Sequence, residues 1–174
     1  MSYLNPPLTA GPARSTAGPR RASYWIALIL FLADQAGKYW VHEYTPYAWS
    51  QAVTGNFNLV QVWNYGAAFS FLADAGGWQR FFFGGVALAV SGWLAFMLRK
   101  PLSHLEMWGY ALILGGALGN GVDRALRGYV VDFLDFHARG WHWPAFNFAD
   151  MGIVCGAALV VLASWRQRPR ENRA

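Results

Sequence analysis

Apolar segments close to 20 residues long constrain this chain more than any other feature. Residues 81–98 form an uninterrupted, uncharged run, and similar segments are expected over residues 24–41, 107–122 and 149–165. About 20 apolar residues are needed for a helix to cross a bilayer. Only 13% of the residues are charged, against about 25% in a soluble domain. The sequence therefore predicts an α-helical integral membrane protein, with four transmembrane helices in one bundle over residues 23–165.

The distribution of basic residues predicts how the segments are oriented. Four spans would put both termini on one side, where nine of the 14 Lys and Arg residues then fall. The positive-inside rule makes that side cytoplasmic. Residues 1–22 are expected to be a flexible cytoplasmic tail and residues 166–174 a basic one. A cleaved signal peptide is the rival interpretation of residues 24–41, but the aromatic pair Tyr39-Trp40 favours a retained helix. The basic residues form no face suited to nucleic acid.

Two regions are then expected to face outwards, at about residues 42–80 and 123–148. The alternation of apolar and polar residues over 57–64 predicts a strand, because successive side chains of a strand point to opposite faces. The first region, residues 42–80, is too long for a simple connector between two helices. We expect it to form a small β-sheet resting on the membrane surface, with its aromatic residues as interfacial anchors.

Acidic residues are concentrated at the outer ends of the segments. Antiparallel neighbours place the end of the third segment, with Asp123, on the same side as the start of the fourth, with Asp150. Asp150 could instead be a helix-start residue, with Asn147 as the cap. Asp34 and Lys38 are four residues apart, so they lie on one helical face and can form a structural ion pair.

Paired carboxylates suggest a definite chemistry. Two carboxyl groups within hydrogen-bonding distance share one proton, because ionising both of them would cost too much free energy. The ionised member can then activate water while the protonated member donates to a scissile carbonyl. The pattern leaves open which of Asp123, Asp132 and Asp135 partners Asp150. The four histidines form no HExxH motif and Cys155 is the single cysteine, so we expect no metal, no disulfide and no cofactor.

Five short blocks, in order along the chain, carry a resemblance to a known family. They are Asp34-Gln-Ala-Gly-Lys38, Asn64-Tyr-Gly66-Ala-Ala-Phe-Ser70, Gly115-Gly-Ala-Leu-Gly-Asn120-Gly-Val-Asp123-Arg124, Val130-Val-Asp132-Phe133 and Phe146-Asn147-Phe-Ala149-Asp150. With them the sequence resembles the bacterial lipoprotein signal peptidases (signal peptidase II), which are aspartic endopeptidases with four transmembrane helices. The resemblance spans most of residues 24–165.

The resemblance implies roles that the residue pattern alone does not assign. It implies that Asp132 and Asp150 are the catalytic dyad. It further implies a supporting set that lines or braces the site: Asp34, Lys38, Asn64, Gly66, Asn120, Arg124, Asn147 and Ala149. Arg124 is expected either to pair with Asp123 or to contact substrate.

The same resemblance implies a substrate and a location. The expected substrate is a prolipoprotein that carries diacylglycerol on a cysteine, cleaved just before that cysteine. The expected location is the bacterial inner membrane, with phospholipid as the surroundings and the active site at the outer face. The outward sheet would cradle the substrate together with a short surface helix, and we expect a monomer.

A small proton-coupled transporter is the alternative function, with Asp34 and Asp150 relaying protons. That function predicts polar groups near the middle of the bilayer and interrupted, repeated helices. The acidic residues of this chain cluster at one interface instead. A non-catalytic membrane scaffold is a third alternative, and it leaves the aspartates without a purpose. The stretch Trp141-His-Trp143 receives no role from the sequence.

Overall fold

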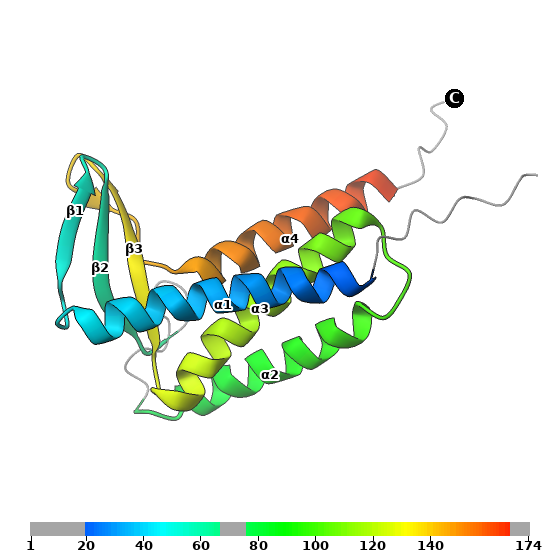
Figure 1. Ribbon diagram of the computed structural model, residues 1–174, viewed down its shortest axis with the longest axis horizontal. Coiled ribbons are helices and arrows are strands. Elements are labelled where there is room, and N and C mark those ends of the chain that lie inside the picture. Colours follow the sequence, from blue (N-terminus) through cyan, green and yellow to red (C-terminus); the bar gives the residue numbers. More distant parts are fainter. Residues whose placement is uncertain (1–19, 67–75, 168–174) are drawn as a thin grey trace, which may run out of the picture.

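The computed structural model describes residues 20–66 and 76–167, which form four helices and a four-stranded sheet (Figure 1). The helices are α1 (Arg20–Tyr44), α2 (Gln79–Met97), α3 (His104–Leu126) and α4 (Phe148–Gln167). The strands are β1 (Ser50–Thr54), β2 (Phe57–Asn64), β3 (Val130–Ala138) and β4 (Trp141–His142). The four apolar segments thus form helices, and α1 and α3 are each a few residues longer at both ends than the hydropathy indicated.

Helix α3 contacts each of the other three helices, and glycines allow this close approach. A Cβ atom on Gly115 would lie 2.6 Å from the carbonyl oxygen of Ala27 in α1, and one on Gly109 would lie 2.8 Å from that of Gly156 in α4. A Cβ atom on Gly119 would lie 2.5 Å from an Asp34 carboxylate oxygen. Glycine at these positions therefore permits the close approach of α3 to α1 and α4. The helix begins with a capping box in which Ser103 and Glu106 bond each other's backbone N–H.

The sheet is antiparallel, in the order β1-β2-β3-β4. The sequence predicted a sheet from residues 42–80 alone, and this was incomplete because β3 and β4 come from the second outward region. Paired residues such as Asn58 and Asp135 join the two regions across the sheet. The described residues contain no short surface helix, and residues 67–75, between β2 and α2, lie outside them. Residues 1–19 and 168–174, which make up most of the expected tails, also lie outside. Residues 20–22 and 166–167 of those tails instead belong to α1 and α4.

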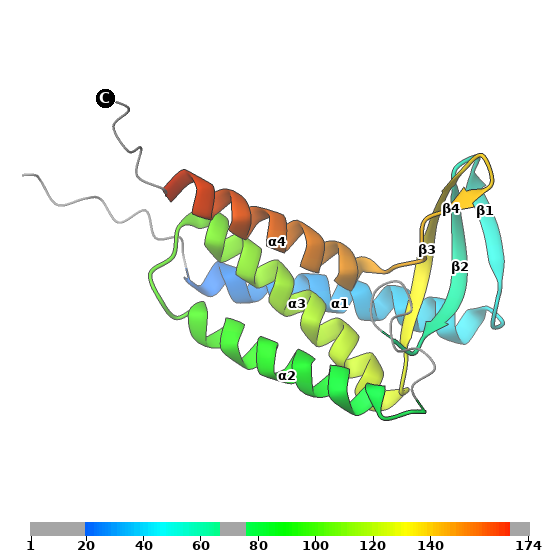
Figure 2. The same cartoon turned by 180° about the vertical axis from the view of Figure 1, so that it is seen from behind.

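The sheet lies across one end of the bundle, and the start of α1 and the end of α4 lie at the opposite end (Figures 1 and 2). Among the described residues, α2 and α4 are each long and apolar enough to cross a membrane. Helices α1 and α3 carry the charged residues that meet beneath the sheet, including Asp34, Lys38 and Asp123. Cys155 lies on α4, where its side chain is exposed.

Candidate active site

Two acidic residues bond the same asparagine, Asn147, where β3 passes the start of α4. Asp132 lies on β3 and is 2% exposed, and Asp150 lies in the first turn of α4. Asn147, which is completely buried, precedes that helix. Its side-chain oxygen accepts from the Asp150 backbone N–H at 3.0 Å, and its backbone N–H donates to the Asp150 carboxylate at 3.3 Å. The predicted cap is therefore present, in a reciprocal arrangement like that of a capping box.

Asn147 also connects the cap to Asp132. Its Nδ2 donates to the Asp132 Oδ1 atom at 2.7 Å. Because the amide oxygen is occupied by the helix cap, the amide nitrogen must face Asp132. One asparagine thus donates to both acids, through its side chain to Asp132 and through its backbone to Asp150.

Two further asparagines complete the shell of donors. Asn64 donates to the Asp132 Oδ2 atom at 3.0 Å, and Asn120 donates to the Asp150 Oδ1 atom at 2.7 Å. The Gly66 N–H binds the oxygen of Asn64, and Lys38 Nζ binds the oxygen of Asn120 at 2.7 Å. These bonds turn each amide nitrogen towards its carboxylate. All four carboxyl oxygens of the two acids therefore accept an N–H group from the protein.

A buried ionic cluster is linked to these asparagines through the hydrogen bond from Lys38 to Asn120. Lys38 pairs with Asp34 at 2.8 Å and with Asp123 at 3.2 Å, and all three side chains are 0% exposed. Asp34 also accepts from the Ala149 N–H at 2.8 Å, which ties α1 to the start of α4. The predicted Asp34–Lys38 pair is confirmed, and Asp123 is its additional partner.

Arg124 does not pair with Asp123, which corrects one of the two expectations for it. Asp123 pairs with Lys38 and Arg127. Arg124 instead donates to the carbonyl oxygens of Gly66 at 2.9 Å and Asn120 at 3.2 Å. It therefore connects the segment after β2 to the helix that carries Asn120. Every residue that the sequence singled out for the site belongs to this one hydrogen-bonded network.

The electrostatic surroundings distinguish the outward acids. Burial, followed by the charge of Asp150, raises the pKa of Asp132 from its ordinary value to about 7, although Asn64 and Asn147 act in the opposite direction. Burial also tends to raise the pKa of Asp135, but hydrogen bonds from His142 and Asn58 outweigh it and hold that pKa below its ordinary range. Of these two acids, Asp132 is therefore the one whose pKa is raised in part by the charge of Asp150, whereas the pKa of Asp135 is lowered.

The histidines of the outward region are occupied elsewhere. His142 lies 2.9 Å from Asp135, and His137 lies 3.3 Å from the side-chain oxygen of Asn58. Within the described ranges, no group of three His, Cys, Asp or Glu side chains is arranged to hold a metal ion. Sequence reasoning missed Gln35, which donates to the Gly119 carbonyl at 3.1 Å. In the sequence, only its position next to Asp34 could have indicated a role for Gln35.

Solved structures define the class of protein. One bacterial membrane enzyme, determined by the in meso method at 2.3 Å, matches with a TM-score of 0.78 and 28% identity, over 88% of this chain and 93% of that one. A second, at 1.9 Å, matches with a TM-score of 0.75 and 27% identity, over 90% of this chain and all of that one. The chain is therefore a bacterial membrane protein with the fold of a membrane enzyme.

Sequence comparison defines the family. The model of the family described as signal peptidase (SPase) II matches residues 26–166. The lipoprotein signal peptidase of Ralstonia nicotianae is 50% identical over 96% of this chain and 98% of its own length. That of Vibrio vulnificus is 48% identical over 85% and 90%, respectively. The chain belongs to the signal peptidase II family and is an aspartic endopeptidase. A transporter function is not supported.

Proposed function

We propose that this enzyme removes the signal peptide from prolipoproteins whose lipobox cysteine carries diacylglycerol, with Asp132 and Asp150 as the catalytic dyad. The observation that carries the assignment is Asn147, which donates to both carboxylates. This arrangement holds two acids side by side in a buried setting, where they share one proton. The other residues of the network hold the amides that orient the dyad.

The reaction follows from the distribution of protons. Asp150, ionised, takes a proton from a water molecule as the water oxygen attacks the scissile carbonyl carbon. Asp132, protonated, donates its proton to the carbonyl oxygen as the tetrahedral intermediate forms. When the C–N bond breaks, the proton held by Asp150 passes to the nitrogen of the lipid-modified cysteine, and one hydroxyl group of the intermediate returns its proton to Asp132 as the carbonyl re-forms. The signal peptide leaves with a new carboxyl group, and the cysteine leaves with a free amino group.

We propose that all four helices of the domain (residues 23–165) cross the bilayer. Helices α1 and α3, of 25 and 23 residues, are about 35–37 Å long at 1.5 Å per residue, which exceeds the hydrocarbon thickness of about 30 Å. Helix α1 exposes large apolar side chains, such as Trp25 at 62% and Ile29 at 64%. Such a surface suits lipid better than water. Arg99 and Lys100 lie between α2 and α3, at the end away from the sheet, which favours cytoplasmic termini.

The hairpin between β3 and β4 supports phospholipid as a partner. Arg139 and Gly140 form its two-residue turn, with φ of 52° and 81°, as a tight hairpin turn requires. Trp141 and Trp143 follow, 62% and 47% exposed, with ring centroids 5.8 Å apart. Tryptophan is typical of the membrane–water interface. We infer that this pair rests among lipid headgroups and that the enzyme acts as a monomer at the outer face.

The substrate assignment predicts a strong preference for the lipid-modified precursor. In a reconstituted gel-shift assay, kcat/KM for the diacylated precursor should exceed that for its non-acylated form by at least about 100-fold, because binding energy from the lipid positions the peptide bond. EDTA should leave the rate unchanged. Equal cleavage of the two precursors would contradict the assignment of the substrate. Loss of activity on chelation, with recovery on adding zinc, would contradict the dyad.

The pKa of Asp132 predicts the pH dependence of cleavage. If Asp132 is the proton donor, kcat/KM should fall as the pH rises above about 7, approaching tenfold per pH unit. Replacing Asn64 with Ala removes a hydrogen bond that lowers this pKa, so the alkaline limb should move to higher pH. Profiles of kcat/KM for the two proteins test this. A rate that rises through this range, or an unmoved limb in the variant, would show that another group is the donor.

A further inference from the structure

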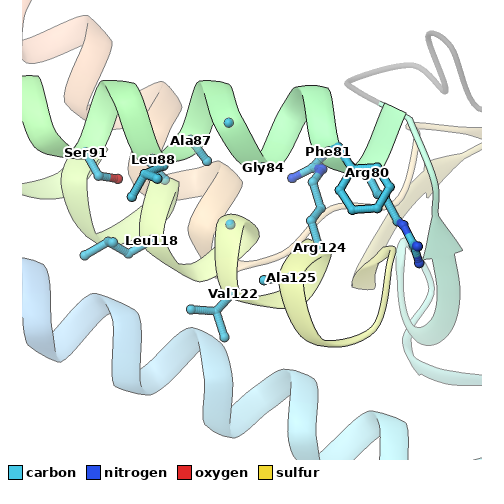
Figure 3. A pocket seen from close by; sticks show the side chains of 13 residues that line it. Arg80, Phe81, Gly84, Ala87, Leu88, Ser91, Leu118, Val122, Arg124 and Ala125 are labelled. Atoms are coloured by element: carbon cyan, nitrogen blue, oxygen red, sulfur yellow. The ribbon is translucent and has the colours of Figure 1, made fainter. Parts of the chain in front are cut away.

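A groove of about 520 Å³ runs along the bundle between α2 and α3 (Figure 3). Small residues form much of its lining, among them Gly84, Gly85 and Ala87 on α2 and Gly121 on α3. A Cβ atom built on Gly84 or Gly85 would meet no heavy atom of the described chain within 4 Å. The small side chains therefore leave open space on the surface of the bundle that would face lipid.

The two ends of the groove differ in chemistry. Arg80, Phe81 and Arg124 lie at one end, and Leu88, Ser91 and Leu118 lie towards the other (Figure 3). The Nε atom of Arg124 is buried and has no hydrogen-bond partner among the described residues. The groove thus begins with two guanidinium groups and continues as an apolar channel.

The charged end of the groove adjoins the dyad. Arg124 donates to the carbonyl oxygen of Asn120, and the side chain of Asn120 donates to Asp150. One residue therefore separates the groove from the carboxylate that we place beside the water. A group attached to the substrate close to the scissile bond can reach the groove without leaving the membrane.

We propose that this groove binds one acyl chain of the substrate's diacylglyceryl group, with Arg80 and Arg124 facing the ester oxygens of the glycerol. The inference rests on the proposed function. The acyl chain moves from bilayer hydrocarbon into a protein groove, so its binding has no hydrophobic driving force. The groove acts through van der Waals contact and through hydrogen bonds from guanidinium to ester oxygen. Its effect is to fix the position of the lipid-modified cysteine relative to the dyad.

The test is to fill the groove and vary the length of the acyl chains. Gly84→Leu places a large side chain in the open space. We expect KM for a dipalmitoyl precursor to rise about five- to tenfold, while KM for a dibutanoyl precursor and the kcat values stay unchanged. Gly92→Leu is the matched control, because Gly92 lies on the same helix, also has no neighbour within 4 Å and does not line the groove.

Three outcomes would overturn the inference. They are an unchanged KM for the dipalmitoyl precursor, an equal rise for the two precursors, and the same rise in the Gly92→Leu control. An equal rise would indicate that bulk phospholipid or the signal-peptide helix occupies the groove. If no acyl chain binds in the groove, the dipalmitoyl and dibutanoyl precursors are still cleaved. If the proposed function is wrong, the preference for diacylated over non-acylated precursor is absent. The two failures are therefore distinguishable.

Discussion

Replacing either Asp132 or Asp150 with Asn is expected to reduce cleavage of a diacylated prolipoprotein by at least about 10³-fold. Asparagine keeps the shape of each side chain, although its NH2 group replaces one of the two oxygens that accept N–H groups. It can neither take a proton from water nor donate one as an acid. The loss should appear in kcat with little change in KM, because the dyad acts on the reacting atoms rather than on substrate binding. Single-turnover cleavage in detergent or proteoliposomes measures it.

Asp135→Asn is the matched control for this experiment. Asp135 lies on the same strand as Asp132 but bonds His142 and Asn58 instead of the α4 cap. The control should retain cleavage within a few-fold of wild type. Loss of activity in Asp135→Asn with retention in Asp132→Asn would reverse the assignment and make Asp135 the partner of Asp150.

The pH dependence of stability tests whether the pKa of Asp132 is raised, and the same unfolding curves show whether Asp132→Asn is folded. A carboxyl whose pKa is raised on folding stabilises the protein most below its unfolded pKa of about 4. That stability is lost as the pH rises through the folded pKa of about 7. Removing the carboxyl should therefore make the variant more stable, relative to wild type, as the pH rises from about 4 to about 8. Thermal unfolding at several pH values measures the difference, and a difference independent of pH would show that the pKa of Asp132 is not raised.

The largest loss of stability is expected from Lys38→Met. Methionine is of similar length but leaves Asp34 and Asp123, both completely buried, without the cation that they share. Removing one member of a buried ionic cluster costs about 3–5 kcal/mol, because the remaining charge stays desolvated. The apparent unfolding temperature in detergent should fall by at least about 6 °C. Cleavage should fall too, because Lys38 also holds Asn120 in the orientation that meets Asp150.

Arg127→Met is the matched control for Lys38→Met. It distinguishes the loss of a buried cation from the loss of any cation that pairs with Asp123. Arg127 pairs with the same Asp123 carboxylate, but its side chain is 19% exposed. Its removal should cost about 1 kcal/mol, and the Asn120 orientation should be unaffected. If Arg127→Met lowered the unfolding temperature as much as Lys38→Met, the buried position of Lys38 would have no special importance.

The four helices could be predicted because their signals are local. An apolar run of membrane length and the end of that run can be found without knowing what lies beside it. The prediction ended α1 at residue 41 and α3 at residue 122, whereas the helices reach Tyr44 and Leu126. These final turns carry polar residues whose partners lie on β2 and β3, so hydropathy did not include them.

The pairing of the outward acids could not be derived from spacing. Asp123, Asp132 and Asp135 all fall within 13 residues of one another, and each could have faced Asp150 as far as the pattern showed. In the folded chain their partners differ: Lys38 and Arg127 for Asp123, His142 and Asn58 for Asp135. Only the resemblance to a family indicated Asp132 beforehand. Strand pairing settles the geometry, since β3 is aligned along β2 and beside the cap of α4.

The sequence by itself determined the membrane-length helices, the Asp34–Lys38 pair and the helix cap at Asn147. Each of these depends on residues that are close together in the sequence. Only the tertiary structure decided that both outward regions share one sheet, that Asp123 completes the buried cluster and that Arg124 binds Gly66. Those contacts join residues tens of positions apart, and the free energy that selects them comes from burial and hydrogen bonding in the assembled fold rather than from local pattern.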